Sequence, residues 1–182
     1  MTAEWVRLTD GAWPKAYSVL PDVGEPHGAV VLAGEMFGVD DQLRSVAQRL
    51  ADEAYAVVCP DFYARTGEGP DFAFDEESRA RAMELMRGLR REKVIEDLTA
   101  ARILAVRHAG GGGIAALGFS LGGHLAVLAA TSMPFDLVVS YYGGWLLDGG
   151  LPLAEPGAPI RRGAEIASNA GSCWASSART TT

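Results

Sequence analysis

The stretch that decides the fold of this chain reads IAALGFSLGG and spans residues 114–123. Its first half is an apolar run with the length of a buried β-strand, and its second half is rich in small residues and opens a helical pattern. The pattern G-x-S-x-G, with Ser120 at its centre, lies at the junction. A serine at so sharp a turn needs a strained backbone, and the flanking glycines remove side chains that would clash with the strand and the helix.

We interpret Ser120 as a nucleophile. The turn aims its hydroxyl at solvent and places it over the N-terminus of the next helix, where the Leu121 N–H is free to donate a hydrogen bond. The alternative is an ordinary glycine-rich turn. Both motif glycines, Gly123 and the preceding strand are all present, and this context favours the nucleophile.

Strand and helix patterns alternate on both sides of this turn. We predict strands at residues 5–8, 16–20, 29–33, 56–59, 114–119 and 137–142, and helices that begin near residues 40, 75, 92 and 121. Asp40 and Asp75 are good N-caps for two of these helices. The first two strands are short and should pair antiparallel at the sheet edge. The order predicts an α/β fold, with a mostly parallel sheet and helices on both faces.

The alternating pattern stops after Gly144. Glycines and prolines interrupt the chain as far as Pro159, and from Gly163 onward the sequence is mostly Ala, Ser, Gly and Thr. No buried strand and no amphipathic helix can be predicted there. We therefore expect an incomplete domain over residues 1–153 and a poorly ordered tail over residues 154–182.

Composition excludes several classes of protein. The 182 residues are 48% hydrophobic, enough for one globular core. The net charge of −7 offers no basic surface for nucleic acid, and the chain lacks the run of about 18 apolar residues that a membrane span needs. Residues 1–10 lack the apolar segment of a secretory signal, so we expect a cytoplasmic enzyme. Cys59 and Cys173 show no spacing typical of a metal site or a disulfide.

Four short stretches together resemble the dienelactone hydrolase family of the α/β-hydrolase superfamily. They are GEMFG at residues 34–38, CPDFYAR at 59–65, SRARAMELM at 78–86, and GFSLGG at 118–123 followed by SYYGG at 140–144. The resemblance implies an α/β-hydrolase-type sheet that lacks its last strands. It also implies hydrolysis of a small carboxylic ester or lactone through an acyl-enzyme, with no cofactor and no metal.

The same resemblance implies roles for individual residues. Ser120 takes the place of the nucleophile, and Glu35 that of the glutamate that contacts and activates it. The backbone N–H groups of Met36 and Leu121 would form the oxyanion hole, and Arg79 resembles the arginine that holds a substrate carboxylate. From the residues alone, Glu35 is expected to be partly buried and to need a partner, either the nucleophile hydroxyl or a structural ion pair. The alternative for Arg79 is a surface arginine beside acidic residues.

The sequence does not supply a base for Ser120. A serine hydroxyl is a poor nucleophile unless a base takes its proton, and in this superfamily the acid and the histidine follow the serine along the chain. His27, His108 and His124 all lie within or before the helix that Ser120 opens. We interpret His124, one turn beyond Ser120, as a packing or surface residue.

Three interpretations of function follow. The first is a hydrolase of carboxylic esters or lactones, and the alternative is a catalytically inactive, truncated remnant that lacks the triad Asp and His. An acyltransferase or thioesterase on the same fold is the third. The substrate stays open, because Met83 stands where some members of the family have a tyrosine. The oligomeric state also stays open, although loss of the last strands would expose a sheet edge and favour self-association.

Overall fold

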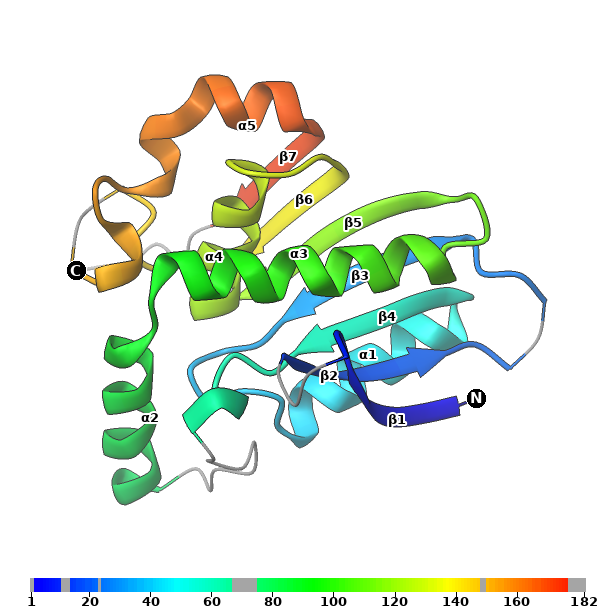
Figure 1. The fold of residues 1–182 in the computed structure, drawn as a ribbon, viewed down its shortest axis with the longest axis horizontal. Coiled ribbons are helices and arrows are strands. Elements are labelled where there is room, and N and C mark those ends of the chain that lie inside the picture. Colours follow the sequence, from blue (N-terminus) through cyan, green and yellow to red (C-terminus); the bar gives the residue numbers. More distant parts are fainter. Residues whose placement is uncertain (1, 11–13, 23, 67–74, 148–149, 177–182) are drawn as a thin grey trace.

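The computed structural model describes residues 2–10, 14–22, 24–66, 75–147 and 150–176. Within these residues one sheet runs in the order β1-β2-β4-β3-β5-β6-β7 (Figure 1). Its strands are β1 Thr2–Arg7, β2 Lys15–Leu20, β3 Gly28–Ala33, β4 Tyr55–Pro60, β5 Gly113–Phe119, β6 Phe135–Tyr141 and β7 Ala170–Ser176. The α-helices are α1 Asp41–Asp52, α2 Glu76–Gly88, α3 Arg91–His108, α4 Leu121–Ala130 and α5 Gly163–Asn169. Short 3-10 turns are η1 Ala64–Thr66, η2 Pro152–Ala154 and η3 Pro159–Arg162.

The sheet is antiparallel at one edge and parallel elsewhere. β2 pairs antiparallel with β1 and with β4, whereas β3 pairs parallel with β4 and β5, and β6 pairs parallel with β5 and β7. The predicted antiparallel edge pair and the predicted mostly parallel α/β sheet are confirmed. Because neighbouring parallel strands run the same way, the carboxyl ends of β3, β5 and β6 meet at one edge of the sheet.

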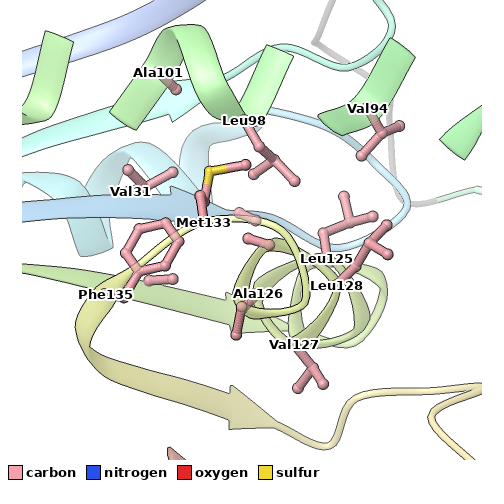
Figure 2. Close-up of a cluster of buried hydrophobic side chains, with 14 of the residues drawn as sticks. Val31, Val94, Leu98, Ala101, Leu125, Ala126, Val127, Leu128, Met133 and Phe135 are labelled. Atoms are coloured by element: carbon pink, nitrogen blue, oxygen red, sulfur yellow. The ribbon is translucent and has the colours of Figure 1, made fainter. Parts of the chain in front are cut away.

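Helices cover both faces of this sheet. Figure 1 shows α1 on one face and α3 and α4 on the other. Successive side chains of a strand point to opposite faces, so Val30 and Leu32 pack with α1 while Val31 packs with α3 and α4. Figure 2 shows Val31 together with Leu98 and Leu125 in the cluster between the sheet and helices α3 and α4, which we call the main cluster. Burial on both faces explains why the sequence of β3 is an unbroken apolar run.

Two aspartates fix the starts of helices beside the sheet. Asp40 Oδ1 accepts a hydrogen bond from the Leu43 N–H at 2.8 Å, directly before α1. Asp75 Oδ1 accepts one from the Ser78 N–H at 2.8 Å, directly before α2. Each carboxylate satisfies an amide that the helix leaves without a partner, and both predicted N-caps are confirmed.

The C-terminal segment differs from the predicted poorly ordered tail. Between residues 154 and 176 the chain forms η3, α5 and β7, while residues 177–182 lie outside the described part. Ile166 of α5 is buried in the main cluster, and Asn169 Nδ2 donates a hydrogen bond to the Ala130 carbonyl at 3.0 Å. β7 is attached through its backbone to β6, and most of its side chains are exposed. A strand held in this way leaves no apolar alternation in the sequence by which to predict it.

Among the described helices, none has both the length and the apolar character to cross a membrane.

Candidate active site

Ser120 occupies the turn between β5 and α4. Its backbone has φ of 53° and ψ of −114°, a conformation that residues other than glycine rarely adopt. The Ser120 N–H donates to the Tyr141 carbonyl at 3.0 Å, and the Ser120 carbonyl accepts from the His124 N–H at 3.3 Å. The strained turn is therefore held from β6 on one side and from α4 on the other.

The glycines of the motif allow the backbones around Ser120 to touch. A Cβ on Gly118 would lie 2.6 Å from the Gly123 amide nitrogen and nearer still to the Gly122 carbonyl. A Cβ on Gly122 would lie 2.6 Å from the Gly34 carbonyl oxygen. Neither position has space for a side chain, because α4 packs directly on β5 and on the end of β3.

Three polar side chains follow three neighbouring parallel strands. Glu35 lies two residues after β3, Ser120 directly after β5, and Tyr142 directly after β6. Because β5 lies between β3 and β6, Ser120 is placed between the other two at the carboxyl edge of the sheet. This edge is where ligands bind in open α/β sheets.

Glu35 has a partner that the sequence analysis did not consider. Its side chain is half-buried, and its Oε1 accepts a hydrogen bond from the Tyr142 hydroxyl at 2.9 Å. Within the described residues, the structure records neither a hydrogen bond from Ser120 to Glu35 nor an ion pair of Glu35. Partial burial, together with the Glu35 hydrogen bond and charge, raises the pKa of Tyr142 to about 12.

Tyr142 is the site residue that sequence reasoning missed. It belongs to the SYYGG stretch, to which no side-chain role was given. The signal available was its position, since a polar side chain directly after a parallel strand lies at the ligand-binding edge.

The two amides expected to form the oxyanion hole lie on segments that pack together. Leu121 is the first residue of α4, so its N–H has no acceptor one turn earlier in the helix. Met36 lies three residues after β3, and its carbonyl accepts a hydrogen bond from the buried Tyr63 hydroxyl at 2.9 Å. That bond fixes the segment after β3, against which Gly122 packs.

Arg79 lies near Met36 rather than beside Glu35. The two residues line a surface pocket of about 400 Å³, together with Phe37, Asp75 and Glu76. The Arg79 side chain is exposed, and among the described residues it has no recorded ion pair.

Glu35 lines a second, smaller pocket of about 150 Å³. Its walls include Tyr142, Phe119 and Asp40. Among the described residues, Ser120 lines neither this pocket nor the Arg79 pocket. The structure thus brings Met36 to Arg79 and Glu35 to Tyr142, and Ser120 lies between the ends of β3 and β6.

His124 is fully buried, one turn along α4 from Ser120. Its Nδ1 lies 3.1 Å from the Gly144 carbonyl oxygen, and because a carbonyl only accepts, Nδ1 carries the hydrogen. Burial, with the nearby charge of Arg91, holds the pKa of His124 below its ordinary value. The ring therefore anchors the loop after β6, and its burial favours the neutral form.

The described residues contain no group of three or more His, Cys, Asp or Glu side chains that could hold a metal ion.

Solved structures of other proteins share this fold. The dienelactone hydrolase-like promiscuous phosphotriesterase from metagenomic libraries is 22% identical with a TM-score of 0.67, over 97% of this chain and 81% of that one. Est1E from Butyrivibrio proteoclasticus is 16% identical with a TM-score of 0.54, over 78% of this chain and 51% of that one. At these identities the likeness shows the α/β-hydrolase fold alone.

Curated relatives are more similar in sequence. The carboxymethylenebutenolidase of Pseudomonas putida is 39% identical over 121 residues, which are 65% of this chain and 51% of the relative. That of Rhodococcus opacus is 32% identical over 133 residues, which are 72% of this chain and 46% of the relative. The chain thus spans about half the length of these relatives. The sequence profile of the dienelactone hydrolase family matches residues 15–168, and the chain belongs to this family.

Proposed function

We propose that the chain hydrolyses a small carboxylic ester or lactone through an acyl-enzyme on Ser120. The observation that carries the proposal is the strained Ser120 turn, set at the start of α4 between the strand ends that bear Glu35 and Tyr142. An ordinary glycine-rich turn needs no non-glycine residue at positive φ, and such strain clusters at functional sites.

In the proposed reaction the Ser120 hydroxyl oxygen attacks the carbonyl carbon of the substrate. The carbonyl oxygen becomes an oxyanion, which the N–H groups of Met36 and Leu121 stabilise by hydrogen bonds. The carbon–oxygen bond to the leaving group then breaks, the leaving oxygen takes up the proton that the Ser120 hydroxyl lost on attack, and Ser120 holds the acyl group. Water releases the acyl group as a carboxylate and restores the hydroxyl.

Glu35 activates Ser120 in this proposal. Tyr142 occupies Oε1 of the carboxylate, which leaves Oε2 to accept the hydrogen of the Ser120 hydroxyl. A carboxylate that accepts this hydrogen raises the electron density on the attacking oxygen.

Arg79 gives the proposed substrate its class. The name carboxymethylenebutenolidase describes a lactone with a carboxylate-bearing arm, and such an anion would suit the guanidinium of Arg79 in the 400 Å³ pocket. We propose a lactone or ester that carries a carboxylate, with its carbonyl toward Met36 and its anion on Arg79.

A second candidate is a domain that binds such compounds without turning them over. The observation that favours it is the position of His124, which is buried and hydrogen-bonded to the Gly144 carbonyl. A histidine held in this way does not act as the base for Ser120.

Acylation of the purified chain by p-nitrophenyl acetate separates the two candidates. We expect intact-mass spectrometry to detect one added acetyl group, and peptide mapping to place it on Ser120. Ser120→Ala should abolish the label, and Ser132→Ala, at an exposed serine away from the site, should not. A folded chain that takes up no acetyl group would refute the hydrolase and support the binding domain.

A further inference from the structure

The Tyr142 hydroxyl holds a carboxylate that the proposed reaction needs. We propose that Tyr142 is a positioning residue, which fixes the Glu35 carboxylate beside Ser120 by a hydrogen bond that crosses the end of β5. The inference rests on the proposed function, because it gives Glu35 the role of activating Ser120. It assigns to Tyr142 no contact with the substrate.

The hydrogen bond between Tyr142 and Glu35 passes over the end of the strand that lies between them. Glu35 follows β3 and Tyr142 follows β6, and β5 lies between these strands. Neighbouring strands are about 4.8 Å apart, so the two residues start roughly 10 Å from each other. A glutamate and a tyrosine side chain together span that distance. The ring of Tyr142 also lies 6.1 Å from the ring of Phe119, the residue that precedes Ser120.

The backbone of Tyr142 is held in a conformation that its side chain does not favour. Its φ is +42°, in the left-handed region, and its N–H donates to the Ser176 carbonyl of β7 at 2.7 Å. The side chain is 42% exposed, so burial of the ring does not account for this strain. The residue held in this strained conformation is the one whose hydroxyl binds Glu35.

The loop that carries Tyr142 is held in place by contacts with α4 and β6. The buried His124 ring binds the Gly144 carbonyl, and Gly143 packs against Ser140, where a Cβ on Gly143 would lie 2.5 Å from the hydroxyl oxygen. Tyr142 is thus anchored through β7 and through α4, the same helix that begins at Ser120. A fixed support is what a positioning residue needs, because small displacements of a catalytic group cost much of its effect.

The chemistry of the pair suits this role. A phenol with a pKa near 12 keeps its proton through the neutral range, so Tyr142 remains a donor at every pH at which an ester hydrolase is assayed. It occupies Oε1 and leaves Oε2 free for the Ser120 hydroxyl. The bond restricts rotation of the carboxylate, and the expected effect is on the rate of acylation rather than on substrate binding.

The first experiment tests the hydrogen bond without reference to activity. Carbon-13 labelled tyrosine allows the Tyr142 phenol to be titrated by NMR in the wild type and in Glu35→Gln. In the wild type we expect a pKa of about 12 for Tyr142. In Glu35→Gln the negative charge is gone while the partial burial of Tyr142 remains, so the pKa should fall below that of the wild type but stay above the ordinary value of about 10. An unchanged pKa of Tyr142 in Glu35→Gln would overturn the proposal.

The second experiment tests the role in acylation. Tyr142→Phe removes the hydroxyl and keeps the ring, and Tyr141→Phe is the matched control at the next position. In Tyr142→Phe we expect the rate constant for acylation of Ser120 to fall at least about tenfold, with KM within roughly twofold of the wild type. Tyr141→Phe should match the wild type. Tyr142→Phe acylated at the wild-type rate, or altered in KM alone, would overturn the positioning role.

The two experiments distinguish failure of this inference from failure of the proposed function. A wild-type chain that is never acylated would refute the hydrolase, and the NMR titration would still decide whether Tyr142 holds Glu35. A chain that is acylated equally fast with and without the Tyr142 hydroxyl would retain the hydrolase and refute the inference.

Discussion

The substitution Gly122→Ala would place a methyl group in steric overlap with the backbone at the end of β3. The added Cβ would lie 2.6 Å from the Gly34 carbonyl oxygen and nearer still to the carbonyl of Ala33. Both obstacles are backbone atoms, so no side-chain rotation relieves the overlap. Either α4 must move away from β3 or the segment after β3 must move away from α4.

The expected cost is large because buried neighbours surround the contact. Ala33 is 2% exposed, and Gly122 lies in a helix that is buried along its whole length. Overpacking of a close-packed interior costs about 1–3 kcal/mol, and sometimes more where the backbone must shift. We therefore expect Gly122→Ala to lower the free energy of unfolding by about 3 kcal/mol, a large part of the roughly 5–15 kcal/mol that domains possess.

Urea unfolding followed by circular dichroism measures this change. Gly88→Ala is the matched control, since it also adds one methyl group to a helix and meets nothing within 4 Å. It should leave stability unchanged or raise it by up to ~1 kcal/mol, because alanine favours helix more than glycine. Equal unfolding midpoints for Gly122→Ala and the wild type would show that α4 does not pack on the end of β3 as described.

Three further predictions test the core, the buried histidine and the cysteines. Leu125 is fully buried, and Leu125→Ala should lower the free energy of unfolding by about 2–5 kcal/mol in urea; a loss below about 1 kcal/mol would contradict its place in the core. Burial, together with the charge of Arg91, lowers the pKa of His124 in the folded chain, so the unfolded chain binds more protons and stability should fall as the pH drops below about 6.5. His124→Asn replaces the ring N–H donor with a side-chain amide that does not titrate, so its urea midpoint should fall less between about pH 7 and pH 5 than that of the wild type. Equal falls in the two proteins would show that His124 does not cause the loss of stability. Cys59 is buried and Cys173 is exposed, so a thiol reagent should modify one cysteine in the folded chain, with peptide mapping to Cys173; fast modification of both would contradict the burial of Cys59.

Local features of the fold could be predicted from sequence because their causes lie within a few residues. Asp40 and Asp75 cap helices through amides three residues away. The unbroken apolar run of β3 follows from burial on both faces of one strand. Likewise, the glycines around Ser120 are required by contacts at the turn itself, which makes the motif recognisable in the chain.

The tail shows where such reasoning stopped. β7 is joined to β6 by main-chain hydrogen bonds, and these do not depend on which side chains the strand carries. Its residues are mostly exposed, so neither apolar alternation nor β-propensity distinguishes it from the Ala-, Ser- and Thr-rich sequence around it.

The sequence by itself determined the alternation of strands and helices, the glycine-rich turn at Ser120 and the family. Only the tertiary structure decided which side chain Glu35 meets. Its partner Tyr142 lies 107 residues away in the chain, and they come together because the sheet places β5 between β3 and β6. A contact of that kind leaves no local pattern in the sequence. The position of each residue follows from its own strand, and the pairing of the two residues arises from the order of the strands in the sheet.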